Sequence, residues 1–225
     1  MTQARLVALL GHPVSGSFSP RMQNAAFAAC GLDWSYVALD VEPDGFEATV
    51  RDLPAAGFVG ANVTTPHKRA AAELAESDLA SVNTLVFDGA RIVGYSTDAE
   101  ILAGLPGERP VILGDGGAAD AFRAALPGAR VFARRGDWPP EVAAADLVVN
   151  ATSERDEILV QLGQGQTLVD LPYPETATAR AAADAGAHVV SGLEVLVAQG
   201  AASFELWTGV SAPVEVMRRA VGLPS

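Results

Sequence analysis

Residues 109–126, RPVILGDGGAADAFRAAL, decide the fold class that this sequence predicts. A short apolar run, a glycine turn and an amphipathic pattern follow one another, which is the order of a strand, a tight turn and a helix. Gly114, Gly116 and Ala119 have the spacing G-x-G-x-x-A, whose glycines let the backbone approach a pyrophosphate at a helix N-terminus. This spacing fits a dinucleotide site, and it equally fits an ordinary strand-to-helix turn.

The next apolar run, RVFARR, ends in Arg134 and Arg135. In NAD-binding sheets the second strand ends in an acidic residue that holds the ribose 2′-hydroxyl, whereas a 2′-phosphate needs a cation there. The two arginines therefore favour NADP over NAD. Asp115 in the glycine loop and Asp120 in the first helical turn would repel a pyrophosphate. A second interpretation is that these carboxylates only stabilise the helix N-terminus and that the loop holds no ligand.

Short apolar runs alternate with helical patterns along the whole chain, which indicates an α/β fold with a largely parallel sheet. Residues 81–98, SVNTLVFDGARIVGYSTD, form two alternating runs about Asp88-Gly89, which is a hairpin signal. The Pro/Gly break PGERP, residues 106–110, is the predicted domain border. The other predicted strands are RLVALLG, WSYVALDV, FVGANV, DLVVNAT, QTLVDLPY and HVVSG, and helices are predicted after Ser19-Pro20, Gly45 and Thr65-Pro66, over DAEILAGL, ETATARAAADAG and PVEVMRRAVG, and from Gly192.

The composition excludes several classes of protein. A net charge of −12, with paired arginines only at 134–135 and 218–219, leaves no basic face for nucleic acid. A single cysteine, Cys30, excludes a disulfide framework and fits a reducing cytoplasm. The histidines lack metal-ligand spacing, so we expect no metal, with His67 and His188 on the surface and His12 in a turn. The N-terminal apolar run is too short for a membrane span, and we expect a cytoplasmic protein.

Lys68, the last residue of ANVTTPHK (61–68), is the only lysine in the chain, against 14 arginines. With Thr65 as N-cap and Pro66 at the first helical position, Lys68 would be the third helical residue, where the helix dipole disfavours a cation. A lysine can transfer its proton and an arginine effectively cannot, so the position suits proton transfer. The alternative is a surface lysine that survives by chance in a lysine-poor chain.

A series of motifs recurs in one order along the chain. In the first half, GHPVSGSFSPRMQN resembles G-x-P-x-x-H-S-x-S-P-x-x-H-N, GANVTTPHK resembles G-x-N-V-T-x-P-x-K, SVNTLV resembles A-V-N-T, and GYSTD resembles G-x-N-T-D. In the second half, LGDGGAA, FARR, NATS, DLPYPET and SGLEVLVAQGAASFELWTG resemble a glycine loop, N-R-T, N-A-T-P, D-M-x-Y-x-P-x-x-T and a C-terminal signature. By these motifs the chain resembles, nearly end to end, the shikimate dehydrogenase family. All four asparagines and Lys68 fall on motif positions.

The resemblance implies the reversible, NADP-dependent reduction of 3-dehydroshikimate to shikimate. It implies Lys68 and Asp98 as the catalytic pair that supplies a proton when hydride turns the ketone into an alkoxide, and the formal donor of the two stays open. The implied substrate ligands are Ser17, Ser19 and Tyr173 for the carboxylate, and Asn62, Thr64, Asn83 and Gln199 for the ring hydroxyls. The implied cofactor ligands are Gly114, Gly116, Gly117, Ala118, Arg134, Arg135, Asn150, Thr152, Leu171 and Gly192. Taken singly, most of these residues also fit plain turn, cap or surface positions.

The resemblance also implies two domains with the active site in a cleft between them. Residues 1–101 together with 203–225 would form an α/β substrate domain, and residues 102–202 a Rossmann-like, doubly wound NADP domain. The chain departs from the family at Gly16, Ser96, Ala99 and Ala133, which replace a histidine, an asparagine, a glycine and an asparagine. The interval from Arg135 to Asp146 is much shorter than the family's, which normally holds a helix and a strand, so we expect a trimmed adenosine end of the cofactor pocket.

Three functions are consistent with these observations. The first is a compact, active NADP-dependent shikimate dehydrogenase. The second is a relative that acts on quinate or another polyhydroxy cyclohexane carboxylate. The third, from another class, is a shikimate-binding relative with a degenerate cofactor site. For the first we expect a small-molecule substrate, no nucleic acid, no membrane partner, and a monomer or homodimer.

Overall fold

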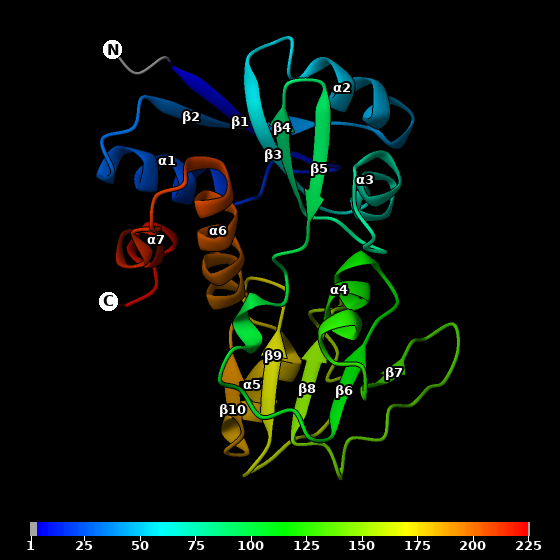
Figure 1. Cartoon of the computed structure of the whole chain (residues 1–225). Coiled ribbons are helices and arrows are strands. Elements are labelled where there is room, and N and C mark those ends of the chain that lie inside the picture. Colours follow the sequence, from blue (N-terminus) through cyan, green and yellow to red (C-terminus); the bar gives the residue numbers. More distant parts are fainter. Residues whose placement is uncertain (1–3, 225) are drawn as a thin grey trace. The chain divides into compact units, whose positions relative to one another are not determined.

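The computed structural model describes residues 4–224 and divides them into two compact units. The first unit holds the described residues up to Thr97 together with those from Val197 onward, and the second is Asp98–Leu196. Each unit has its own five-stranded sheet with helices packed on it (Figure 1), which confirms the predicted α/β class. The predicted domain limits, after residues 101 and 202, lie a few residues beyond these borders.

The sheet of the first unit is mixed rather than largely parallel. Its strands are β1 (Arg5–Gly11), β2 (Trp34–Asp40), β3 (Phe58–Val63), β4 (Thr84–Asp88) and β5 (Arg91–Tyr95), in the order β2-β1-β3-β4-β5. Strands β1, β2 and β3 are parallel, whereas β4 runs antiparallel to both β3 and β5. The hairpin predicted about Asp88-Gly89 is β4–β5, and Gly89 has the positive φ of 62° that its turn requires.

The helices of the first unit are α1 (Ser19–Ala29), α2 (Phe46–Asp52), α3 (Lys68–Leu74), α7 (Val214–Val221) and the later part of α6 (Gly192–Thr208). A short 3-10 turn, Pro43–Gly45, precedes α2. Helix α1 packs beside α7 and β2. The side chains of α2, α3, β1, β3 and β4 share one apolar core, which includes Leu10, Val50, Val63, Ala71 and Leu85.

Two helix starts differ from the prediction. Ser19 does not cap α1, because the residue before the helix is Phe18 and Ser19 is already helical. Helix α3 begins at Lys68 itself, with His67 at the cap position, so Lys68 is the first helical residue instead of the third. The physical reason is a separate turn before α3, closed by the His67 backbone N–H that donates to the Thr64 carbonyl at 2.9 Å.

The sheet of the second unit is entirely parallel. Its strands are β6 (Pro110–Leu113), β7 (Arg130–Phe132), β8 (Leu147–Asn150), β9 (Thr167–Asp170) and β10 (His188–Val190), in the order β10-β9-β8-β6-β7. Strands β6, β8 and β9 are buried along their whole length, as expected for a sheet covered on both faces. The helices are α4 (Gly117–Ala125), α5 (Ala177–Asp184) and the start of α6, and DAEILAGL contains only a 3-10 turn, Glu100–Leu102.

The connection from β7 to β8 is unusually simple. Residues 133–146, all of which the structure describes, contain no helix or strand, so the sheet ends at the three-residue strand β7. The absence of a helix and a strand agrees with the shortness of the interval, and the trimmed adenosine end of the cofactor pocket stays a prediction. The predicted strand RVFARR ends at Phe132, so both arginines belong to the connection. Within the described residues, no helix has the length and apolar character needed to cross a membrane.

Candidate active site

The glycine loop after β6 has the geometry of a phosphate cradle. Gly114 has φ +116°, and a Cβ there would lie only 3.0 Å from the Ala151 carbonyl oxygen, so both conformation and space require glycine. Gly116 is the N-cap residue of α4, and a Cβ on Gly116 would meet nothing within 4 Å. The amide groups of the first turn, which includes Gly117 and Ala118, are therefore placed to donate to phosphate oxygens.

The sheet order places this loop where α/β sheets bind ligands. Strand β6 lies between β7 and β8. The chain therefore continues from β6 to β7 on one side and then returns to β8 on the other side. Ligands bind at the carboxyl ends of the strands beside such a switch point. The Ala151 N–H donates to the Leu113 carbonyl at 2.9 Å and the Leu171 N–H donates to the Asn150 carbonyl at 3.0 Å, which aligns three strand ends. These strand ends and the glycine turn before α4 fit a dinucleotide.

Gly192, the first residue of α6, packs against the segment that follows β9. A Cβ on Gly192 would lie 2.4 Å from the Leu171 carbonyl oxygen and 2.5 Å from that of Pro172. A side chain here would push the start of α6 away from the segment after β9, so glycine is required for close backbone packing. Of the predicted cofactor residues, the structure thus brings together Gly114, Asn150, Leu171 and Gly192.

A series of hydrogen-bonded polar side chains, Thr152, Asn150 and Asp170, lies at the ends of β8 and β9; this series is called the buried polar chain below. The Asn150 side chain is fully buried, donates from Nδ2 to Asp170 Oδ1 at 2.7 Å, and accepts from the Thr152 hydroxyl at 2.7 Å. Burial raises the pKa of Asp170, and hydrogen bonds from Asn150 and Thr176 act in the opposite direction. Asp170 was not among the predicted site residues, although its place at the end of a buried strand is a signal that could have indicated it.

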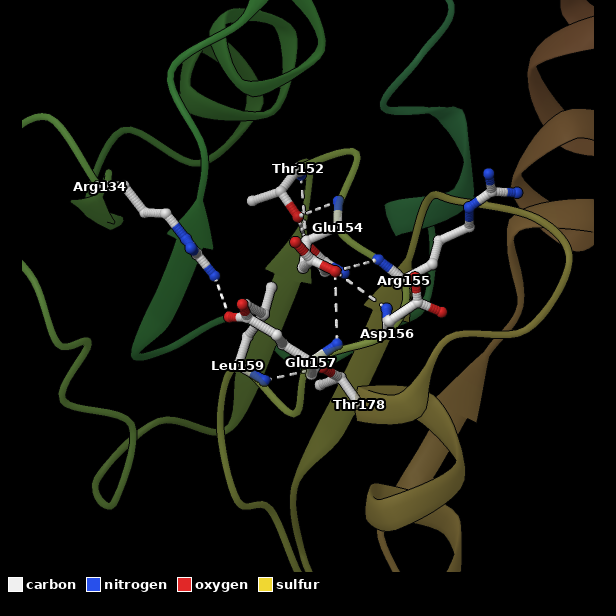
Figure 2. Close-up of polar contacts among 9 residues, drawn as sticks. Arg134, Thr152, Glu154, Arg155, Asp156, Glu157, Leu159 and Thr178 are labelled. Atoms are coloured by element: carbon white, nitrogen blue, oxygen red, sulfur yellow. Dashed lines mark hydrogen bonds and ion pairs between the residues drawn. The ribbon is translucent and has the colours of Figure 1, made fainter.

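Arg134 and Arg135 both lie exposed on the connection after β7. The Arg134 guanidinium forms an ion pair with the Glu157 carboxylate, and it lies over the Trp138 ring at 5.5 Å from the centroid. Figure 2 shows the side chains of Arg134 and Glu157 pointing toward each other. Arg134 comes from the connection after β7, and Glu157 comes from the loop that follows Thr152. Sequence reasoning missed Glu157, because nothing in its own segment indicates an arginine 23 residues earlier.

In the first unit, Asn62 is the centre of a buried network rather than a surface group. Only 4% of Asn62 is exposed; Nδ2 donates to Thr84 Oγ1 at 3.1 Å and to Ser203 Oγ at 3.0 Å. Its Oδ1 accepts from the Tyr36 hydroxyl at 2.8 Å. These bonds tie β2, β3, β4 and α6 together around one amide, so a contact between Asn62 and the substrate stays a prediction.

Asn83 fixes the segment before β4 to the segment after β5. Its Oδ1 accepts from the Thr97 backbone N–H at 2.8 Å, and its Nδ2 donates to Thr97 Oγ1 at 3.0 Å. Asn83 is 2% exposed and Thr97 is 3% exposed. The network therefore sets the backbone at the end of the first unit, directly before Asp98 in the chain.

The two predicted carboxylate-binding serines lie side by side. Ser17 Oγ donates to Ser19 Oγ at 3.2 Å, and the Ser19 backbone N–H donates to Ser17 Oγ at 3.2 Å. Ser17 is half-buried and Ser19 is 5% exposed. A contact of these two hydroxyls with a substrate carboxylate stays a prediction.

Lys68 is held at the first position of α3 by its neighbours. Its own carbonyl accepts from the Val82 N–H at 3.0 Å, which joins the helix start to the segment before β4. The expectation that His67 lies on the surface is wrong: it is 2% exposed, stacks on Phe46 with ring centroids 4.5 Å apart, and contacts the Val41 carbonyl at 2.7 Å. Because a carbonyl only accepts, His67 Nε2 carries the proton and donates it.

The remaining histidines and predicted residues lie as follows. His188 is exposed on β10, as predicted, and His12 is exposed in a bend after β1 with Nδ1 2.5 Å from Asp40 Oδ1. No group of three metal-ligating side chains occurs among residues 4–224. Thr64 is half-buried after β3, Gln199 is half-buried on α6, Tyr173 is half-buried after β9, and Asp98 is 8% exposed. Asp98 and Tyr173 belong to the second unit and Lys68, Thr64 and Gln199 to the first, so their grouping into one site stays a prediction.

The chain matches known proteins along nearly its whole length. The family model of the shikimate dehydrogenase substrate binding domain matches residues 9–85, and that of the shikimate 5′-dehydrogenase C-terminal domain matches residues 192–221. The chain is 39% identical to a shikimate dehydrogenase (NADP(+)) of an Anaeromyxobacter species over 268 positions, covering 97% of this chain and 96% of the relative. It is 40% identical to the protein of the same name from Methanopyrus kandleri, covering 97% and 95%.

Solved structures agree with the sequence matches. A shikimate 5-dehydrogenase from Thermus thermophilus, crystallised in complex with NADP(H) and shikimate, is 30% identical and aligns with a TM-score of 0.85, covering 96% of this chain and 98% of that one. The 268-position alignment is longer than the 225 residues of this chain, so that relative carries segments that are missing here. Sequence identity over the full length, the two family models and the fold agree, and the chain belongs to the shikimate dehydrogenase family.

Proposed function

We propose that this protein is an NADP-dependent shikimate dehydrogenase that interconverts 3-dehydroshikimate and shikimate. The observation that carries the proposal is identity of about 40% to proteins named shikimate dehydrogenase (NADP(+)) across 97% of the chain. The glycine loop at the switch point of the second sheet and the paired serines of the first unit support it. The protein would work in the cytoplasm as a monomer or homodimer, without a metal.

The second unit is proposed to hold NADP. The amides of Gly116, Gly117 and Ala118 would receive the pyrophosphate, and the segment around Thr152 and Leu171 would border the rest of the cofactor. When bound, the cofactor supplies or accepts the hydride at the carbon that bears the reacting oxygen. Arg134 and Arg135 are the cations proposed for the 2′-phosphate. Asp115 and Asp120 lie near the phosphate loop, where like charge would weaken binding, and Arg123 lies 3.7 Å from Asp120 and offsets part of that charge.

The first unit is proposed to orient the substrate. Ser17 and Ser19 would donate their hydroxyl protons to the carboxylate, with Tyr173 as a further donor. Thr64, Asn83 and Gln199 would contact the ring hydroxyls. Asn62 would contact them as well, and buried hydrogen bonds hold its amide and that of Asn83 in place. A site held by buried hydrogen bonds loses little entropy when the substrate binds.

Lys68 is proposed to transfer the proton. In the reducing direction hydride adds to the ketone carbon, the oxygen gains negative charge, and a proton from Lys68 Nζ neutralises it as the new O–H bond forms. Asp98 would hold the ammonium in place before transfer. Which of the two residues is the formal proton donor stays open.

The test is shikimate oxidation followed by NADPH absorbance in the parent and in Lys68→Arg. The variant keeps the charge and loses the transferable proton, so we expect kcat to fall by about 100-fold or more, with shikimate binding changed only a few-fold. Arg51→Lys on α2, an exposed residue paired with Glu47, exchanges the same two residue types and should leave the rate unchanged. Equal rates in the parent and Lys68→Arg would refute the catalytic role.

The same assay separates the other two functions. Faster oxidation of quinate than of shikimate would assign a different substrate range. Shikimate binding without turnover by either NADP or NAD would indicate a binding protein whose cofactor site has degenerated.

A further inference from the structure

Arg134 is held between an acidic and an aromatic side chain, both supplied by segments outside β7. The Glu157 carboxylate forms an ion pair with the guanidinium, and the Trp138 ring lies beneath it. Trp138 belongs to the short connection from β7 to β8, and Glu157 to the connection from β8 to β9. The guanidinium that the sequence offers to a 2′-phosphate therefore already has a counter-anion.

The backbone around Glu157 is fixed from both sides (Figure 2). On one side, Glu154 Oε1 accepts from the backbone N–H groups of Arg155 at 2.9 Å, Asp156 at 2.9 Å and Glu157 at 3.3 Å. On the other side, the Thr178 hydroxyl donates to the Glu157 carbonyl at 3.1 Å and accepts from the Leu159 N–H at 3.0 Å. The carboxylate of Glu157 is thus presented to Arg134 by a loop whose main chain is held in one conformation.

This loop is anchored in the buried polar chain. The Glu154 N–H donates to Thr152 Oγ1 at 3.2 Å, and the Thr152 hydroxyl donates to Asn150, which contacts Asp170. The pKa of Glu154 is lowered, and the hydrogen bond from the Asp156 N–H is the largest cause. The hydrogen bonds from the Glu157 and Arg155 N–H groups and the charge of Arg134 lower it further. The loop therefore keeps a second carboxylate ionised within the field of the same arginine.

We propose that Glu157 is a specificity-determining residue that weakens the preference of this chain for NADP over NAD. This inference rests on the proposed function. A 2′-phosphate must displace Glu157 from Arg134 before it gains that cation. NAD carries a hydroxyl at this position and does not compete with Glu157.

The expected effect is modest, because Arg134 and Glu157 are both more than half exposed and water screens their attraction. Replacing Glu157 by Gln removes the competing charge and keeps the size of the side chain. We expect the ratio of kcat/KM for NADP to that for NAD to rise about 3- to 10-fold, through a lower KM for NADP, with the NAD constants unchanged.

Three further variants make this test specific. Arg134→Gln should lower the ratio, and Glu157→Gln added to Arg134→Gln should have no further effect, because its only route is through that arginine. Glu141→Gln is the matched control: Glu141 pairs with Arg130 at 3.4 Å in the same unit, and its loss changes the net charge equally. A similar rise in Glu141→Gln, or a rise that persists without Arg134, would overturn the inference.

Binding of fragments provides a readout that is independent of shikimate turnover. Adenosine 2′,5′-bisphosphate and 5′-AMP differ only in the 2′-phosphate, and calorimetry measures both on the whole protein. Glu157→Gln should tighten the bisphosphate about 3- to 10-fold and leave 5′-AMP unchanged. If this holds while shikimate is not oxidised, the proposed function fails and the role of Glu157 stands. Unchanged or weaker bisphosphate binding, or none in any variant, overturns the role of Glu157.

Discussion

His67 provides the sharpest test of how the first unit positions its lysine. Its ring is 2% exposed, stacks on Phe46 at a centroid distance of 4.5 Å and an interplanar angle of 10°, and donates to the Val41 carbonyl at 2.7 Å. In His67→Ala, a lost aromatic pair costs about 1 kcal/mol, a lost hydrogen bond about 1 kcal/mol, and the cavity about 1 kcal/mol more. We expect the free energy of unfolding to fall by about 2–4 kcal/mol.

The functional effect follows from the position of His67 directly before Lys68. Without the anchor on Val41, the start of α3 loses one of the contacts that position it, so Lys68 is placed less accurately. We expect kcat to fall about 10-fold or more, since small misplacements of a reacting group are costly.

Urea unfolding and shikimate oxidation measure the two effects in the same variants. With a slope of about 2–3 kcal/mol/M, the urea midpoint should fall by about 1 M. His188→Ala, the same change at the exposed end of the chain's other sheet, should alter neither quantity. If His67→Ala and His188→Ala have the same midpoint and the same kcat, the reasoning on His67 is refuted.

Two further predictions concern stability. In Gly60→Ala, the new Cβ would lie 2.3 Å from Trp207 Nε1 and 2.6 Å from the Leu85 carbonyl that Trp207 donates to, so unfolding measurements should show a loss of about 2–4 kcal/mol. Gly16→Ala, where a Cβ meets nothing within 4 Å, should stay within about 0.5 kcal/mol, and equal losses in the two variants would contradict the packing argument. For Asp146, burial raises the pKa but the N–H groups of Arg109 and Glu108 lower it more, so the net shift is downward. A lowered folded-state pKa gives stability that is present above the unfolded-state pKa of about 4 and is lost as pH falls through the folded-state value. Asp146→Asn should therefore lower the free energy of unfolding by about 1–2 kcal/mol at neutral pH and by progressively less below about pH 4. An equal loss at neutral pH and below pH 4 in urea unfolding would rule out this linkage.

Local signals in the sequence determined much of this fold. The hairpin at Gly89, the turn at Gly114 and the close packing at Gly192 each depend on a glycine whose conformation or missing Cβ is a property of that residue alone. Buried strands such as β8 and β9 appear as apolar runs because both faces of their sheet are covered. The order of the motifs then indicated the family, and full-length identity confirmed it.

Helix starts and polar partners are where sequence reasoning failed. Ser19 and Thr65 have the composition of N-caps, yet turns closed by the backbone come first and the helices begin at Ser19 itself and at Lys68. His67 looked like a surface residue because its partners, Val41 and Phe46, lie more than 20 residues earlier in the chain.

By itself, the sequence determined most of the elements, the family and the residue types available for chemistry, because periodicity and glycine conformation act over a few residues. Only the tertiary structure decided how these groups are used. It placed Asn62 beside Ser203, which is 141 residues away, and it brought Glu157 onto Arg134. A hydrogen bond or ion pair depends on distance in space, and distance in space between remote segments is set by packing of the whole sheet rather than by any local pattern.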